Sequence, residues 1–361
     1  MDDNLDKKIQ IQKEAILAHL KMNKRSCICT SVGTGKSYMA ISRITSYNSQ
    51  SKILFVGARE IYSENFKKEL IKSKNEKWIE NITFICTGSL HHYEGEYWDL
   101  MINDESHKMT DQLIKSIPKI IATNNNVEIL CLTGTPKKYS PLYLYCPISY
   151  EKFIDDAIEE QLINDYKITI VKHGLTKKEY SKYLFFYKKW EEFKEDNPIY
   201  TGFPSEMSML KSVLKNLESK EEACKYLLDK YLQQKKTLIY AGTIKQSKKM
   251  QIEMFHSQME ESKRWDNYEA FVKGDINWLV NVNSLKEAVS VPGLQYIIIM
   301  AADAASDSMQ QIVGRALRLV VGQIASIIIL CAKNTIEEKW VEKALFKLDQ
   351  NKIKTIELSS I

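Results

Sequence analysis

The chain has 361 residues, of which 44% are hydrophobic and 27% charged, and its formal net charge is +5. This composition is typical of globular proteins and is too apolar for a disordered chain, and the length predicts two or three domains. The longest apolar runs fall far short of the roughly 18 residues that span a bilayer, and the amino-terminal segment MDDNLDKKIQIQKE contains no apolar signal segment. We therefore expect a protein that is not secreted and that works in the cytoplasm, or in the nucleus or virion of a host. The seven cysteines form no C-x-x-C pair, so we expect reduced thiols.

The first 148 residues alternate short apolar runs with amphipathic stretches. Helices are expected at 36–46 and 61–72, and the expected strands are 26–30, 52–56, 83–86, 99–102 and 128–132. Strands that alternate with helices are typical of a parallel, doubly wound α/β sheet. We predict that residues 1–148 form one such domain.

The rest of the chain, residues 149–361, predicts a second α/β domain that contains a helical insertion. Residues from about 175 to 235 are rich in Lys, Glu, Leu and Tyr and have few β-branched runs, which predicts helices. After this insertion, apolar runs return, and they predict strands at 237–241, 278–282, 296–300 and 326–331.

A glycine-rich loop follows the first predicted strand, in the segment SVGTGKS at 31–37. Gly33 and Gly35 allow the backbone to curl so that its N–H groups point at a phosphate. Lys36 can reach the phosphates, and the Ser37 hydroxyl can bind Mg²⁺. Position 30 is threonine, so only the second half of the pattern G-x-x-x-x-G-K-[ST] is present. The strand–loop–helix context is nevertheless the one that a nucleotide-binding loop requires.

An acidic pair ends the fourth predicted strand, in the segment Asp104-Glu105-Ser106-His107. Carboxylates at the carboxyl end of a buried strand lie where open α/β sheets bind ligands. We expect Asp104 to hold Mg²⁺ and Glu105 to orient the water that attacks the γ-phosphate. For His107 two roles stay open: a link between the nucleotide site and the second domain, or a structural hydrogen bond.

A basic motif, QIVGRALR, occupies residues 311–318. Arg315 and Arg318 are three residues apart and would share one helix face, where they would form an anion clamp. The alternative is a solvated basic face. Gln311 and Gly314 complete a larger pattern, which favours the clamp.

In this order the motifs resemble those of the superfamily-two helicases and translocases, in the DExH-box branch that includes type III restriction-like and phage helicases. The resemblance covers nearly the whole chain, and the matching segments are 30–37, 53–59, 87–90, 104–107, 132–136, 237–243 and 311–318. It implies two RecA-like domains with ATP and Mg²⁺ in the cleft between them, and an ATP hydrolase that moves along nucleic acid. Gln12 resembles the glutamine that reads adenine in this family. The other residues that the resemblance assigns to nucleotide binding or catalysis are Gly33, Thr34, Gly35, Lys36, Ser37, Asp104, Glu105, Gln311, Arg315 and Arg318.

The resemblance also implies a nucleic-acid path along the loops that follow several strands. Backbone N–H groups and small hydroxyls suit phosphate contacts without base readout, so we expect binding that is not sequence-specific. DNA is favoured over RNA, because 150–166 resembles type III restriction-like helicases and 335–344 resembles Swi/Snf-type translocases. The expected contacts are Arg59, Thr87, Gly88, Gly242 and Thr243.

Lysines and aromatic residues alternate in the segment KKEYSKYLFFYKKW at 177–190. The rings could stack on bases while the lysines bind phosphates. The helical period of 3.6 residues instead favours a helix that buries its rings and exposes its lysines. We expect the second arrangement.

One motif departs from the family pattern. Where the resemblance predicts glycine and aspartate, this chain has Ala288 and Ser290, which puts the coupling of hydrolysis to nucleic acid in question. Two other functions therefore stay open: an ATP-gated nucleic-acid clamp or assembly factor with weak turnover, and an RNA-directed helicase. Strand separation and translocation alone are not distinguished, and the compact layout and the Lys, Asn and Ile content fit a phage or viral origin.

Overall fold

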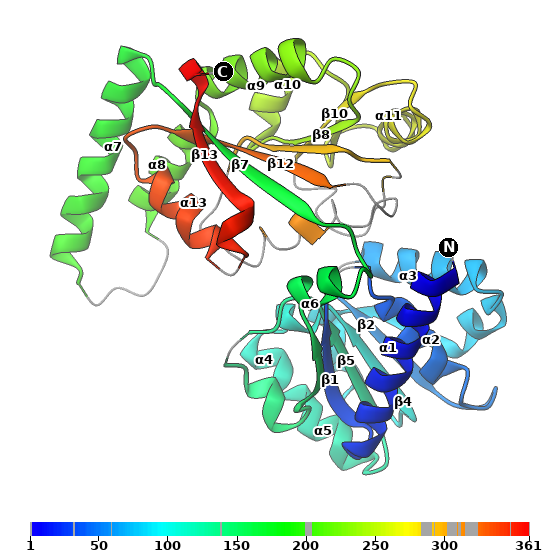
Figure 1. Ribbon diagram of the computed structural model, residues 1–361. Coiled ribbons are helices and arrows are strands. Elements are labelled where there is room, and N and C mark those ends of the chain that lie inside the picture. The colour runs from blue at the N-terminus through cyan, green and yellow to red at the C-terminus, as the bar shows by residue number, and fades with distance from the viewer. Residues whose placement is uncertain are drawn as a thin grey trace. The chain divides into compact units, whose positions relative to one another are not determined.

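The computed structural model describes residues 2–31, 33–58, 60–137, 139–198, 204–282, 291, 293–301, 309, 312–314, 324–346 and 348–360. The contacts between residues divide the chain into two compact units, Met1–Ile163 and Asn164–Ile361. Each unit is built on a parallel sheet of its own (Figure 1).

The first unit contains a six-stranded sheet in the order β3-β2-β4-β5-β1-β6. All the neighbouring strands that pair in this sheet are parallel. Parallel neighbours require crossover connections, which places the carboxyl ends of all the strands at one edge. The strands are β1 (Arg25–Thr30), β2 (Ile53–Gly57), β3 (Ile82–Cys86), β4 (Leu100–Asp104), β5 (Glu128–Thr133) and β6 (Ile148–Lys152).

Helices cover both faces of this sheet (Figure 1). Successive strand residues point to opposite faces. Phe55 of β2 stacks on Phe66 of α3 with ring centroids 4.4 Å apart, whereas Leu54 joins the buried cluster that contains Ile117 and Ile120 of α5. The helices are α1 (Asp2–Lys21), α2 (Lys36–Ile44), α3 (Glu60–Lys72), α4 (Asp111–Ile114), α5 (Ser116–Thr123) and α6 (Ile154–Glu159).

The boundary between the units lies after β6. β6 pairs with β1 through registers such as Cys29↔Glu151, so its residues belong to the first sheet. A division at 148/149, as expected from the sequence, would separate this strand from its partner. The contacts place the division between Ile163 and Asn164.

The second unit contains a seven-stranded sheet in the order β13-β7-β12-β11-β8-β10-β9. Every pair in this sheet is also parallel. The strands are β7 (Tyr166–His173), β8 (Thr237–Tyr240), β9 (Met254–His256), β10 (Trp278–Val282), β11 (Tyr296–Ile299), β12 (Ala325–Ala332) and β13 (Ile353–Glu357).

In the described part of the expected insertion, three helices lie between β7 and β8. One face of α7 packs inward: Tyr183 is buried with Leu210 and Leu214 of α8 and with Trp340 of α13. The expectation that the aromatic residues of 177–190 form core is therefore confirmed for Tyr183, with Tyr187 and Trp190 partly buried against it, whereas Tyr180 and Phe185 are exposed. The helices of this unit are α7 (Lys177–Asp196), α8 (Ser205–Lys215), α9 (Glu218–Tyr231), α10 (Ile244–Met250), α11 (Glu261–Lys273) and α13 (Glu337–Leu345).

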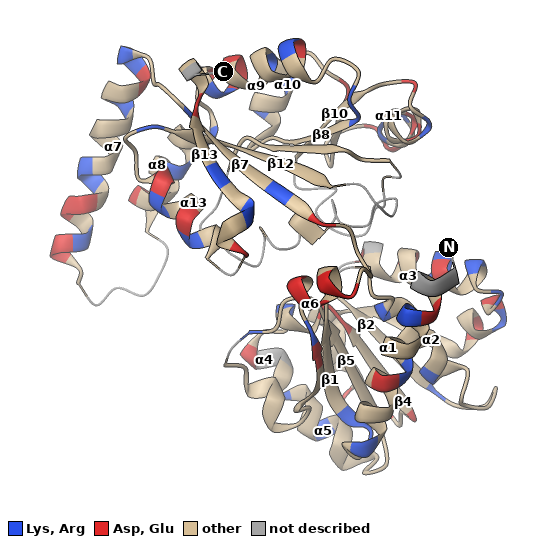
Figure 2. Cartoon of the chain, viewed as in Figure 1, with Lys and Arg blue, Asp and Glu red and all other residues tan. Residues whose placement is uncertain are grey.

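The predicted α/β class with two parallel sheets is confirmed. Figure 2 shows acidic and basic residues interspersed along the helices of both units. The seven cysteines are free thiols, and all of them except Cys86 are buried. Among the described helices, none combines the length and the apolar character needed to cross a membrane.

Candidate functional site

The glycine-rich loop connects β1 to α2 at the carboxyl edge of the first sheet. Gly33 and Gly35 adopt φ angles of 92° and 95°, in the left-handed region that glycine enters without steric cost. The Thr34 hydroxyl donates to the Ser31 carbonyl at 2.9 Å. The Lys36 ammonium donates to the carbonyls of Thr30 at 2.9 Å and Ser31 at 3.2 Å. This lysine is therefore held against the loop by neutral acceptors, which a phosphate would replace with stronger, charge-assisted hydrogen bonds.

Gln12 of α1 contacts this loop directly. Its Nε2 atom donates to the Thr34 carbonyl at 3.1 Å. It also lies so close to Gly35 that a Cβ atom at that position would be 2.2 Å away. The structure therefore brings together Gln12, Thr34, Gly35 and Lys36, which the sequence assigned to one nucleotide site.

Polar groups beside the loop lack partners. Within the described residues, the buried hydroxyl oxygens of Thr30, Ser31 and Thr135 have no hydrogen-bond partner. Thr30 and Ser31 lie at the end of β1, and Thr135 follows the end of β5. Buried hydroxyls are normally satisfied, so these three mark an edge of the sheet where a polar ligand fits.

Asp104 ends β4 and is partly buried. Burial and the neighbouring Glu105 carboxylate raise the pKa of Asp104 to about 7, while the Lys36 ammonium and the backbone N–H of Glu105 act in the opposite direction. That N–H lies 3.0 Å from Asp104 Oδ1. The charge of Lys36 thus reaches Asp104, although residues from 37 to 103 separate them in the chain.

Glu105 and His107 connect the end of β4 to the end of β5. Glu105 has a left-handed φ of 51°, which is uncommon for a residue with a side chain. His107 Nδ1 lies 3.4 Å from Glu105 Oε2 and 2.9 Å from Thr133 Oγ1. Thr133 Oγ1 in turn accepts the N–H of Thr135 at 3.1 Å. His107 therefore has a hydrogen-bonding role within the first unit.

The carboxylate of Asp104 and the hydroxyl of Ser37 are oxygen donors of the kind that Mg²⁺ prefers. A carboxylate that burial destabilises gains most from a nearby cation. The described residues contain no cluster of three or more His, Cys, Asp or Glu that could hold a metal alone. Mg²⁺ typically takes only one or two protein ligands and completes its shell with water and substrate phosphates, so this sparse donor set suits a nucleotide-bound Mg²⁺.

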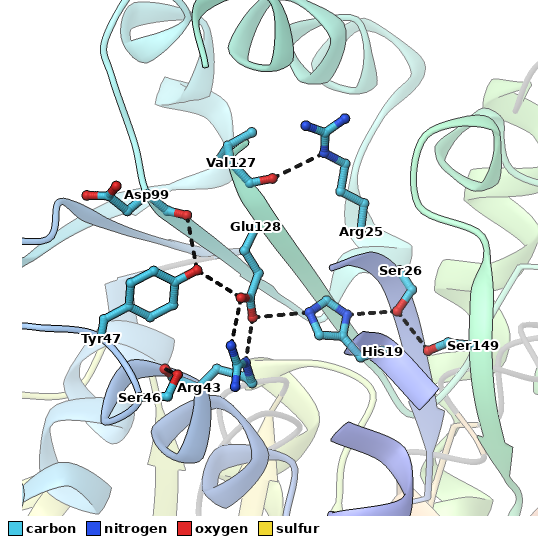
Figure 3. Close-up of polar contacts among 10 residues, drawn as sticks. All are labelled: His19, Arg25, Ser26, Arg43, Ser46, Tyr47, Asp99, Val127, Glu128 and Ser149. Atoms are coloured by element: carbon cyan, nitrogen blue, oxygen red, sulfur yellow. Dashed lines mark hydrogen bonds and ion pairs between the residues drawn. The ribbon is translucent and has the colours of Figure 1, made fainter. Parts of the chain in front are cut away.

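A buried ionic network fixes α1 and α2 at the opposite, amino edge of the sheet (Figure 3). Glu128 starts β5, is fully buried and accepts from Arg43 Nε at 2.6 Å and Nη2 at 2.8 Å. It also contacts His19 Nε2 at 3.1 Å and the Tyr47 hydroxyl at 2.8 Å. His19 Nδ1 lies 2.8 Å from the Ser26 hydroxyl. Burial alone would raise the pKa of Glu128, but the hydrogen bonds from Arg43 and His19 lower it to about 2.

This network is the part of the site's support that the sequence analysis missed. His19 and Gln12 both belong to α1, so the network helps to hold the helix that carries Gln12. The available signal was a glutamate, Glu128, at the start of a strand whose next four residues are apolar. A charge in such a place requires a buried partner.

The expected nucleic-acid contacts of the first unit lie after β3. The Thr87 hydroxyl donates to the Gly57 carbonyl at 3.0 Å, and Thr87 is buried. Gly88 is exposed, with open space where a Cβ atom would be. Arg59 lies outside the described residues.

The expected contacts of the second unit lie after β8. The N–H of Gly242 donates to Gln246 Oε1 at 2.9 Å, and a Cβ atom at Gly242 would lie 2.8 Å from the Cβ of Ala301. Thr243 caps α10: its Oγ1 accepts the N–H of Gln246 at 3.1 Å and donates to Asn216 Oδ1 at 2.6 Å. Gln311, Arg315, Arg318, Ala288 and Ser290 lie outside the described residues.

Two protein families match the chain. The family described as "Type III restriction enzyme, res subunit" matches residues 6–138. The family described as "Helicase conserved C-terminal domain" matches residues 211–320. Comparison with curated protein sequences finds no match.

Solved structures share the fold of the whole chain. The ATP-dependent Type ISP restriction-modification enzyme LlaBIII bound to DNA is 15% identical with a TM-score of 0.62, and the alignment covers 96% of this chain but 31% of that enzyme. Dbp5 of S. cerevisiae bound to RNA and ADP BeF3 is 10% identical with a TM-score of 0.63, covering 97% and 90%. The Hef helicase domain of Pyrococcus furiosus is 13% identical with a TM-score of 0.54, covering 91% and 96%. The two sheets thus correspond to the RecA-like domains of these proteins.

Proposed function

Because the chain belongs to the type III restriction-like branch of the superfamily-two helicases, we propose that it is an ATP-dependent helicase or translocase that moves along nucleic acid, with DNA as its preferred polymer. The family is one of ATPase-type enzymes. The observation that carries the proposal is a loop with two left-handed glycines whose Lys36 ammonium lies near enough to Asp104 to lower the pKa of that carboxyl.

The residues of the first unit divide the chemistry of ATP hydrolysis among them. Lys36 exchanges the carbonyls of Thr30 and Ser31 for the β- and γ-phosphates of ATP. Ser37 and Asp104 hold Mg²⁺, which neutralises phosphate charge when it is bound. Glu105 orients the attacking water, and its left-handed backbone fixes the direction of the carboxylate. Gln12 contacts the loop and reads the adenine base.

Three further groups complete this proposal on the basis of the family resemblance. Gln311, Arg315 and Arg318 would stabilise the charge that develops on the γ-phosphate, as arginine fingers do. They stay predictions, because they lie outside the described residues.

The preference for DNA rests on the restriction-enzyme family. The match to the res subunit covers the whole phosphate-binding region, and the Type ISP enzyme with the same fold is bound to DNA. Dbp5, also similar in fold, is bound to RNA, so both polymers belong in the test. The nucleic-acid contacts proposed are Arg59, Thr87, Gly88, Gly242 and Thr243.

The test is steady-state ATP turnover with no polymer, single-stranded DNA, double-stranded DNA or RNA. We expect DNA to stimulate turnover most, and Lys36→Ala or Glu105→Gln to reduce the stimulated rate by about 10²-fold or more. Lys77→Ala and Glu76→Gln are matched controls, since both residues are exposed and lie outside the motif segments, between 53–59 and 87–90; they should retain the full rate.

The other outcomes separate the alternatives. ATP binding without stimulation by any polymer would contradict the motor and favour the clamp. Stimulation by RNA alone would favour an RNA-directed helicase. Full turnover in Lys36→Ala would show that the loop is not the catalytic site.

A further inference from the structure

A small hollow lies in the second unit where the helical insertion meets the start of α10. It has a volume of about 220 Å³, below the range of roughly 300–1,000 Å³ of sites that enclose a small molecule. Its lining comes from the first turns of α7, the end of α8, α9 and α10. The lining residues are Thr176, Lys178, Glu179, Lys182, Val213, Asn216, Leu217, Glu218, Glu221, Lys245 and Lys249.

The topology places this hollow at the carboxyl edge of the second sheet. β7 and β8 belong to one parallel sheet, so both end at the same edge. α7 begins shortly after β7, and α10 begins after β8. Figure 2 shows basic residues on both α7 and α10.

The acidic residues of the hollow are already engaged. Glu179 accepts the backbone N–H of Thr176 at 2.9 Å and that of Ser219 at 3.0 Å. Lys249 lies 3.0 Å from Glu218 and 3.5 Å from Glu221. These carboxylates are therefore bound to groups of the protein itself.

Three lysines of the hollow, unlike its carboxylates, are not engaged by other groups in the described part of the protein. Lys178, Lys182 and Lys245 are exposed, and within the described residues they have no hydrogen-bond or ion-pair partner. Lys178 and Lys182 are four residues apart, so they lie on one face of α7. The hollow thus presents three available ammonium groups to an anion at its mouth.

The hollow is also continuous with the expected nucleic-acid contact of this unit. Asn216 lines it and accepts a hydrogen bond from Thr243, the residue that caps α10. A polymer whose phosphate reaches Gly242 and Thr243 would meet the lysines with a neighbouring phosphate.

We infer that Lys178, Lys182 and Lys245 bind the phosphodiester backbone of nucleic acid and extend its path from Thr243 onto the helical insertion. The inference rests on the proposed function. The small volume of the hollow suits phosphates held at the surface, in agreement with contacts that do not read bases.

The test measures binding of the protein to a fluorescein-labelled oligodeoxythymidine and to the matching oligouridine. Fluorescence anisotropy gives the binding constant K at several salt concentrations. Each phosphate contact on a single strand contributes about 0.7 to the slope of log K against log salt. The triple variant Lys178→Ala/Lys182→Ala/Lys245→Ala should therefore reduce the slope by about 2 and weaken binding to all sequences alike. The variant Lys178→Arg/Lys182→Arg/Lys245→Arg, which keeps the charge, should restore the slope.

A charge-matched control removes lysines at the other edge of the same sheet. Lys167, Lys235 and Lys273 are exposed and lie at or just before the starts of β7, β8 and β10. Lys167→Ala/Lys235→Ala/Lys273→Ala should keep the wild-type slope. Thermal unfolding of each variant establishes that it is folded.

The outcomes separate the inference from the proposed function. If polymers stimulate ATP turnover in the wild type but both triple alanine variants keep the wild-type salt slope of binding, the inference is overturned and the proposed function stands. If no polymer binds or stimulates the wild type, the proposed function fails first. If the Lys178 triple variant loses binding to fluorescein-labelled polyglutamate but keeps its nucleic-acid slope, the hollow binds an acidic polypeptide and the inference is wrong.

Discussion

Glu128→Gln removes the charge at the centre of the ionic network without changing the shape of the side chain. Glu128 is fully buried and bonded to Arg43, His19 and Tyr47. Its pKa of about 2, against an ordinary value of 4.5, corresponds to about 3 kcal/mol of stability at neutral pH, at about 1.4 kcal/mol per pH unit. Breaking a buried pair by removing one partner costs about 3–5 kcal/mol, a range that includes this value.

The sign of the pH dependence follows from the lowered pKa. The ionised carboxylate stabilises the folded state fully above a pH of about 4.5, and this contribution is lost as the pH falls toward about 2. The variant is neutral at every pH. We therefore expect the difference in stability between wild type and Glu128→Gln to be about 3 kcal/mol at neutral pH and to shrink in acid.

Hydrogen-exchange mass spectrometry of the full chain measures this difference locally, on peptides that cover β1 and β5. Glu76→Gln, at an exposed position, is the matched control and should leave exchange unchanged. The double variant Arg43→Met/Glu128→Met removes both charges and should cost less than Glu128→Gln, because it leaves no unpaired ion. A loss below about 1 kcal/mol that does not vary with pH would show that the network is too solvated for this reasoning.

Two further substitutions test the loop and the second unit. Gly35→Ala places a methyl group 2.2 Å from Gln12 Nε2 at a φ of 95°, and should weaken binding of a fluorescent ATP analogue at least about tenfold. Gly95→Ala is the control, because open space surrounds that position, and it should leave the affinity unchanged. Equal affinity in both variants would contradict the assignment of the loop. Lys220→Met removes the cation of the buried Lys220–Glu337 pair, while Glu337 still accepts the N–H of Ala332 at 2.9 Å. The variant should destabilise the second unit by about 3–5 kcal/mol, and hydrogen exchange on β12 measures this loss. A loss within about 0.5 kcal/mol, as at a surface site, would refute the buried ion pair between Lys220 and Glu337.

The strands that the sequence predicted are those with continuous apolar runs. β2 and β5 are buried along their whole length, and a strand covered on both faces is a nearly continuous apolar run in the sequence. β6, β7, β9 and β13 were not predicted. β7 and β13 carry lysines between their apolar residues, and β9 has only 3 residues, so local pattern gave too little signal. Their pairing is decided by tertiary contacts that spacing along the chain does not encode.

The candidate site also contains one part that local sequence patterns predict and another part that they do not. The phosphate loop and the acidic pair have short local patterns, because a loop that wraps a phosphate needs glycine and lysine at fixed spacing. The support from His19, Arg43 and Glu128 joins residues that are 85 and 109 positions apart, and no local pattern predicts such a set. The lysines of the insertion could be read as basic, but only the fold shows that Lys178 and Lys245 line one hollow.

The two edges of the first sheet separate stability from function. At the amino edge, Glu128 has three side-chain partners, and Ser26 bonds to both His19 and Ser149, so the groups of this network satisfy one another. At the carboxyl edge, within the described residues, the hydroxyls of Thr30 and Thr135 have no partner. β1 spans both edges, from Ser26 to Thr30. A buried network whose groups satisfy one another can hold the strands in register, and this rigid support lets the opposite edge keep unsatisfied groups for a ligand that supplies the missing contacts.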